Sequence, residues 1–111
     1  MQEDRIAVTL CENLRTASYI PFYLAHTADY WHDAGLDVKL WTAPDPSQTA
    51  EALLDGRVSV SWGGPMRVMM HHDKDRNSPL VCFAQVVARD PFVLVGREPN
   101  LDFRFQDLVG P

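Results

Sequence analysis

The sequence predicts an α/β fold, an open, mostly parallel sheet flanked by helices. Short segments that are β-branched or of alternating polarity alternate with segments of helical periodicity over most of the 111 residues, in the order β-α-β-α-β-α-β-β. Glycine and proline stand where the helices are expected to begin and end. Strands that alternate with helices indicate a parallel sheet covered on both faces.

The first part of the chain supplies a strand, a helix and a second strand. Residues 5–10 (RIAVTL) alternate and are β-branched, so they predict a strand. Residues 20–34 repeat apolar side chains at helical spacing and predict one helix, with Pro21 in its first turn and Gly35 just after its end. Residues 37–41 (DVKLW) predict the second strand.

The middle of the chain repeats this pattern. In the segment TAPDPSQTAEALLDG, Asp45 is a favourable N-cap, Pro46 suits the first helical position and Gly56 closes the helix. Residues 58–61 predict a third strand, and residues 65–72 predict a third helix.

Two further strands are expected after the third helix. They are residues 80–88 (LVCFAQVVA) and 92–96 (FVLVG), separated by RDP, and a less regular tail follows. A chain of this length suffices for one domain, or for one lobe of a larger protein.

Composition excludes several function classes. Ten Lys+Arg against fifteen Asp+Glu give a formal charge of −5 with no basic run, so we expect neither nucleic acid nor an anionic membrane as a partner. No apolar stretch approaches the roughly 20 residues that cross a bilayer. The N-terminus lacks the layout of a secretory leader, so we expect either an intracellular protein or a chain that begins after its leader.

Cysteine and histidine usage indicates no metal or redox site. Cys11 and Cys82 lie in or beside predicted strands, and we expect both to be small buried side chains. The alternative is a disulfide, which would need an oxidising compartment. Residues 71–75 (HHDKD) look like a metal cluster, but adjacent histidines at a helix end point in different directions. We therefore expect no metal, and no catalytic set of residues can be assembled.

The turn between the third strand and the third helix is the strongest candidate ligand site. In open parallel sheets, ligands gather at the carboxyl ends of the strands. With Pro65 as the first helical residue and Gly64 as the N-cap, free N–H groups could hold a carboxylate, sulfonate or phosphate. Gly63 lets a ligand approach the backbone, and Trp62 could form an apolar wall. The alternative is an ordinary tight turn beside a core tryptophan.

Other rim positions complete the candidate set. Asn13 and Tyr19 follow the first strand and offer an amide and a hydroxyl. Arg15 is a possible anion partner that we expect to be mostly solvated. The residues predicted to contact a ligand are Asn13, Tyr19, Trp62, Gly63, Gly64, Pro65 and Gln85.

Five segments in a fixed order carry a family resemblance. They are IPFYLA, AGLDVKL, PSQTAEALLDGRVSVSWGGP, DPFVLVGREP and QDLVG, and the likeness covers residues 5–110. Their order and spacing resemble the SsuA/THI5-like (NMT1) group of periplasmic binding proteins with the type 2 fold. The resemblance implies two α/β lobes that clamp a ligand between them. Residues 1–111 match the first lobe, so we expect the second lobe to be absent or truncated.

The resemblance also implies a function. We expect the solute-binding component of an ABC importer, which captures a small, possibly anionic organic molecule such as a sulfonate, a taurine-like compound or a pyrimidine thiamine precursor. The implied partners are permease subunits, the complete protein is expected to be a monomer, and no cofactor is expected. The implied compartment is the periplasm, or the cytoplasm if Met1 is the native start.

Two alternatives remain. A THI5-like pyrimidine synthase resembles the receptors but uses a lysine that bears pyridoxal phosphate and a histidine. Those positions fall on Gly63 and Arg67, and a Schiff base needs an amine, so we expect no enzyme. Ser59 stands where the family commonly has Asp, which puts the detailed ligand assignment in doubt. The other alternative is an interaction domain with no small ligand.

Overall fold

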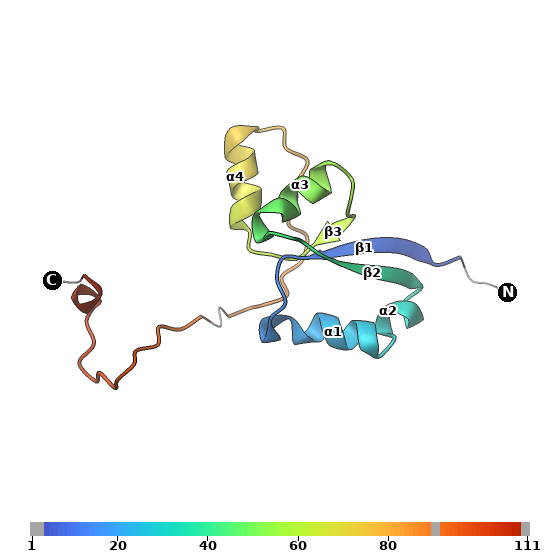
Figure 1. Cartoon of the computed structure of the whole chain (residues 1–111). Coiled ribbons are helices and arrows are strands. Elements are labelled where there is room, and N and C mark those ends of the chain that lie inside the picture. The colour runs from blue at the N-terminus through green and yellow to red at the C-terminus, as the bar shows by residue number, and fades with distance from the viewer. Residues whose placement is uncertain (1–3, 90–91, 110–111) are drawn as a thin grey trace.

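The computed structural model, which describes residues 4–89 and 92–109, confirms the predicted fold class. Three parallel strands form the sheet: β1 (Ile6–Glu12), β2 (Leu36–Thr42) and β3 (Val60–Ser61). Their spatial order is β2-β1-β3, so the first strand in the sequence is the central one (Figure 1).

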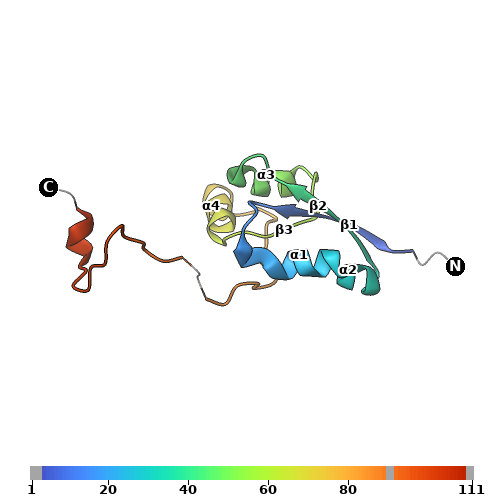
Figure 2. The ribbon, with the colours of Figure 1, turned by 60° about the horizontal axis from the view of Figure 1, so that its bottom comes forward.

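Helices cover both faces of this sheet. The helices α1 (Ile20–Thr27) and α2 (Tyr30–Asp33) lie on one face, and α3 (Thr49–Leu54) and α4 (Met66–Lys74) lie on the other (Figures 1 and 2). The chain passes from β1 outward to β2 and then back across β1 to β3. This reversal places a topological switch point, where ligands tend to bind, between the carboxyl ends of β1 and β3.

Strand pairing is unequal on the two sides of β1. All seven residues of β1 pair with β2, whereas only two pair with β3. Two backbone hydrogen bonds beyond the ladder, from Ser59 N to Thr9 O at 2.9 Å and from Trp62 N to Cys11 O at 3.1 Å, extend this contact at both ends of β3. The ends of β1 and β3 are therefore held side by side.

Local chemistry sets the helix boundaries as predicted. Short 3₁₀ turns, η1 (Ala17–Tyr19) and η2 (Pro46–Gln48), precede α1 and α3. Asp45 caps η2 by accepting a hydrogen bond from Ser47 N at 2.7 Å. Gly35 and Gly56 have φ of +77° and +75°, the left-handed conformation expected after a helix end.

The prediction of a single helix over residues 20–34 is wrong. α1 ends at Thr27, and Asp29 has φ of +57° before α2 begins at Tyr30. The Thr27 hydroxyl donates to the carbonyl of Tyr23 at 2.9 Å in the last turn of α1. Aspartate tolerates the left-handed conformation better than most residues, so the chain turns here without glycine.

The two strands predicted over residues 80–88 and 92–96 are also absent from the described residues. A strand needs the hydrogen-bonding edge of a partner, and β3 offers an edge of only two residues. Val81 and Phe83 are accordingly 75% and 77% exposed. Asp90 and Pro91, which separate the two segments, lie outside the described residues.

One of the two cysteines contradicts the expectation of burial. Cys11 is fully buried in β1, and burial raises the pKa of its thiol. Cys82 lies in the unpaired segment 80–88 and is exposed. Both thiols are free.

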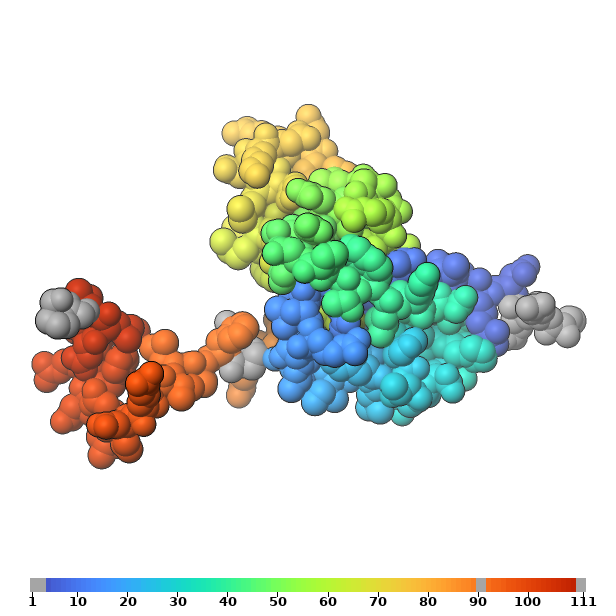
Figure 3. Space-filling model, in the orientation of Figure 1, coloured from blue at the N-terminus to red at the C-terminus, as the bar shows by residue number. Residues whose placement is uncertain are grey.

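The folded body is small, and the end of the chain lies away from it. A core cluster of Cys11, Ala43, Ala52 and Val58 joins the sheet to α3. Residues 92–109, including the 3₁₀ turn η3 (Phe105–Leu108), extend away from the sheet and helices (Figure 3). In the described ranges, no helix has the length and apolar character needed to cross a membrane.

Candidate functional site

The carboxyl ends of β1 and β3 bring three residues together: Asn13, Gly63 and Arg67. Asn13 follows β1 directly, and Gly63 follows β3 after Trp62. A β-carbon built on Gly63 would lie 3.8 Å from Asn13 Nδ2 and 3.8 Å from Arg67 Nη1. A side-chain amide and a guanidinium thus meet at one glycine at the switch point of the sheet.

The orientation of Asn13 is fixed by its own loop. Its side chain is buried, with 8% exposure, and Oδ1 accepts a hydrogen bond from Leu14 N at 2.9 Å. The nitrogen Nδ2 consequently faces Gly63, and in the described part of the chain it donates to no acceptor. A buried amide with an unused donor is suited to hold an acceptor oxygen of a ligand.

The entrance to α4 is open to solvent. Gly63, Gly64 and Pro65 are exposed, and a β-carbon on Gly64 would meet nothing within 4 Å. Pro65 is the N-cap, one residue later than expected, and the first helical hydrogen bond runs from Met69 N to Pro65 O. The N–H groups of residues 66–68 therefore have no acceptor within the helix.

Trp62 is held among aromatic side chains of the neighbouring helix. It is 4% exposed, and its ring centroid lies 4.0 Å from that of Phe22 and 5.2 Å from that of Tyr19. Its Nε1 has no hydrogen-bond partner in the described structure. The predicted site residues Tyr19 and Trp62 thus contact each other and join the end of β3 to α1, which leaves only part of the indole available to a ligand.

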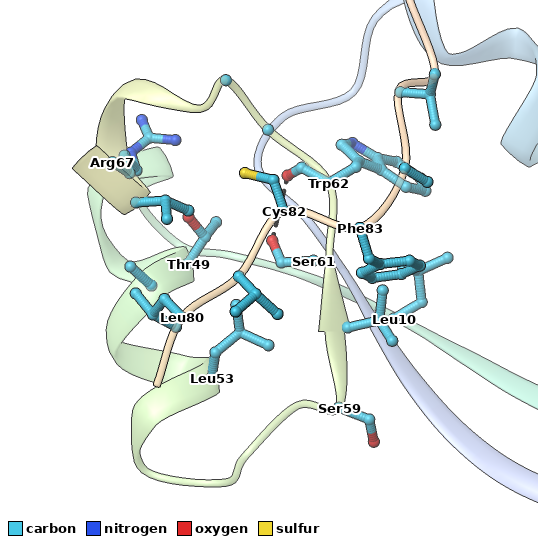
Figure 4. Close-up of a pocket in the computed structure, with 18 of the residues that line it drawn as sticks. Leu10, Thr49, Leu53, Ser59, Ser61, Trp62, Arg67, Leu80, Cys82 and Phe83 are labelled. Carbon is cyan, nitrogen blue, oxygen red and sulfur yellow. Dashed lines mark hydrogen bonds between the residues drawn. The ribbon is translucent and has the colours of Figure 1, made fainter. Parts of the chain in front are cut away.

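A cavity of about 470 Å³ lies beside this rim, between β3, α3, α4 and residues 79–86. Its volume is in the range of small-molecule sites. In Figure 4, Arg67 and Thr49 lie at one end, and Trp62 and Phe83 lie at the other. The lining is mostly apolar, and Gly63 and Gly64 belong to it.

Gln85 does not join the other candidates. It is exposed on the unpaired segment, where its Nε2 donates to Val87 O at 3.2 Å, and it is outside the lining of the cavity. Its selection depended on a strand over residues 80–88, which would have carried it to the rim.

Sequence reasoning missed Glu12, the last residue of β1. Its side chain is fully buried and accepts hydrogen bonds from Thr42 Oγ1, from Tyr23 Oη at 3.0 Å and from Arg15 Nη2 at 2.9 Å. Burial alone would raise the pKa of this carboxyl, but the hydrogen bonds from Thr42, Arg15 and Tyr23 and the charge of Arg15 together lower it. An acidic residue followed three positions later by arginine was the only local signal.

The same network explains the position of Arg15. Its guanidinium pairs with Glu12 and lies 5.5 Å from the ring centroid of Tyr23. Arg15 is 71% exposed, in agreement with the expectation of a mostly solvated residue. Its charge is nevertheless paired with Glu12, so its guanidinium is already engaged by a carboxylate of the chain itself.

One of the two histidines in the last turn of α4 has a structural contact. His72 Nε2 lies 2.8 Å from Leu80 O, which ties the end of α4 to the following segment. Within residues 4–89 and 92–109, no three His, Cys, Asp or Glu side chains are grouped so that they could hold a metal ion.

Comparison with known proteins identifies relatives. The family described as NMT1/THI5-like matches residues 16–111. A protein of Bacillus subtilis (strain 168) named "Putative binding protein YtlA" is 26% identical over 109 residues, which cover 98% of this chain and 33% of that protein. The chain thus spans about a third of the length of this curated relative. No solved structure matches the chain significantly.

Proposed function

The chain belongs to the NMT1/THI5-like family, and from this premise we propose that it is the ligand-contacting lobe of a receptor that delivers a small organic molecule to an ABC importer. Family membership and the name of the relative support a solute-binding role. The observation that carries the proposal is the open glycine entrance of α4, faced by the unused Nδ2 donor of Asn13.

In the proposed complex, the ligand lies against Gly63, Gly64 and Pro65. Asn13 Nδ2 and the free N–H groups at the start of α4 donate hydrogen bonds to its acceptor oxygens. Tyr19 and the accessible part of Trp62 contact its apolar atoms. Candidate ligands are sulfonates, taurine-like compounds and pyrimidine precursors of thiamine.

The complete receptor is proposed to close a second lobe over this rim and so exclude water from the ligand. The greater length of the relative is consistent with such a lobe. We further propose that the receptor acts as a monomer in the periplasm together with permease subunits, and that it has no catalytic activity. Gly63 offers no amine for a Schiff base, so pyridoxal phosphate chemistry has no attachment point there.

A ligand screen on the full-length natural protein tests the proposal. Sulfonates, taurine analogues and pyrimidines are added, and the melting temperature and the binding isotherm are measured. We expect at least one compound to bind, and at 100 times its Kd to stabilise the fold by about 2.7 kcal/mol.

The variant Asn13→Ala and its control Asn77→Ala, an exposed asparagine outside the rim, locate the binding. Asn13→Ala is expected to weaken binding about tenfold, because one hydrogen bond to the ligand is lost, whereas Asn77→Ala leaves it unchanged. The proposal fails if no compound binds the folded protein, or if Asn13→Ala binds as the wild type does.

A further inference from the structure

Arg67 is an unpaired cation in the lining of the cavity, at one end of it in Figure 4. It lies in the first turn of α4, is half-buried, and is the one charged residue among the described residues that line the cavity. In the described ranges, its guanidinium has no carboxylate within 4.0 Å and makes no hydrogen bond.

The carboxylates of Asp45 and of Glu12, the last residue of β1, are engaged by other groups. Asp45 accepts hydrogen bonds from Ser47 N and Ser47 Oγ as the cap of η2. Its pKa is lowered mainly by Ser47 and to a smaller extent by the charge of Arg67, so the two groups are near each other without forming an ion pair. Glu12 is buried and occupied by its own three donors.

Two donor groups lie beside Gly63. Among the described residues, and apart from the chain neighbours of Gly63, Arg67 Nη1 and Asn13 Nδ2 are the atoms within 4 Å of its built β-carbon. The amide is more than nine-tenths buried, and its free nitrogen is directed at this position. A partner that covers the rim removes water from the guanidinium, a cost that only a paired charge offsets.

We infer that Arg67 makes the site select anionic ligands. The ligand carries an oxyanion group that pairs with Arg67 and accepts a hydrogen bond from Asn13 beside Gly63. This inference rests on the proposed function and narrows its ligand class. A carboxylate or a sulfonate has the two oxygens that the guanidinium and the amide require. The apolar lining of the adjacent cavity suits the body of such a molecule.

Matched pairs of compounds test the inference on the full-length protein. Alkyl and aryl sulfonates are compared with their sulfonamides, and carboxylates with their carboxamides, by titration calorimetry. For each pair that binds, the anion is expected to bind at least about tenfold more tightly, as for hydrogen bonds to a charged group. Its affinity should fall with added salt.

Three variants separate the role of Arg67 from general effects. Arg67→Ala should bind the anion and its neutral analogue equally and lose the salt dependence. Arg67→Lys retains a charge and should keep part of the preference. Arg76→Ala removes an exposed arginine that lies outside the cavity lining and should change nothing.

The possible outcomes distinguish the two proposals. Equal affinity of the wild-type protein for anionic and neutral partners overturns the inference and leaves the proposed receptor function standing. An anion preference that persists in folded Arg67→Ala also overturns it. Failure of every compound, charged or neutral, to bind overturns both.

Discussion

Glu12 is a carboxylate whose burial depends on partners that are distant in the sequence. Charged side chains are almost never fully buried unless they are paired. Tyr23 lies 11 residues away and Thr42 lies 30 residues away, in a helix and a strand that only the fold brings to Glu12. Periodicity therefore could not predict this network, whereas the rim position of Asn13 was predicted from its place in the loop that follows the first strand.

Acid should reveal the contribution of Glu12 to stability. Its pKa is lowered in the folded state, so its stabilising effect is complete above the pKa of the unfolded chain and is lost as the pH falls through the folded pKa. We expect the free energy of unfolding, measured with urea, to fall more steeply on acidification for the wild type than for Glu12→Gln. Parallel pH profiles for the two proteins would contradict this assignment.

Two glycines should respond to alanine in opposite ways. A β-carbon on Gly63 meets only ordinary contacts, so Gly63→Ala should retain wild-type stability while weakening the binding of any ligand that approaches the backbone. Gly56 has φ of +75°, so Gly56→Ala should destabilise the fold by about 1 kcal/mol and leave the Kd unchanged. Urea unfolding and calorimetry measure the two effects, and loss of stability in Gly63→Ala would refute the first.

At the scale of the element, local chemistry was predictable and partner-dependent structure was not. The cap formed by Asp45 and the glycines after two helices act within a few residues, and the sequence predicted all of them correctly. The break at Asp29 was missed, because the apolar spacing continues through it. The strands over residues 80–88 and 92–96 were predicted wrongly for another reason. Alternating polarity indicates that a segment could form a strand, but it does not indicate whether a neighbouring strand has a free edge to pair with.

The break between α1 and α2 makes a prediction about Asp29. Its left-handed backbone is free of strain only for glycine and is worst for a β-branched residue. Asp29→Gly should preserve or slightly raise the melting temperature, and Asp29→Val should cost about 1–2 kcal/mol. If Asp29→Val is as stable as the wild type, the two helices are continuous in solution.

At the scale of the whole molecule, the described chain combines a compact α/β body with an exposed apolar segment. Val81, Phe83, Phe92, Val93 and Val95 are each at least 75% exposed. The maximal dimension of 67 Å reflects the extended end of the chain rather than the sheet and its helices. Hydrophobic burial is therefore concentrated in residues 10–80.

Hydrogen exchange should map this division. Amides of β1 bond to strands on both sides, so they should be among the most protected in the chain of 111 residues. Amides of residues 80–88 have no strand partner and should exchange orders of magnitude faster. Comparable protection of the two segments would mean that a fourth strand is paired in solution.

The strand order also has a consequence for the moment at which the protein is made. The longer pairing, between β1 and β2, and every partner of Glu12 lie within residues 6–42. This unit can fold on the ribosome before β3 has been translated. The nascent chain can therefore bury the Glu12 carboxylate early, and the half of the rim that carries Asn13 can form before Gly63 is synthesised.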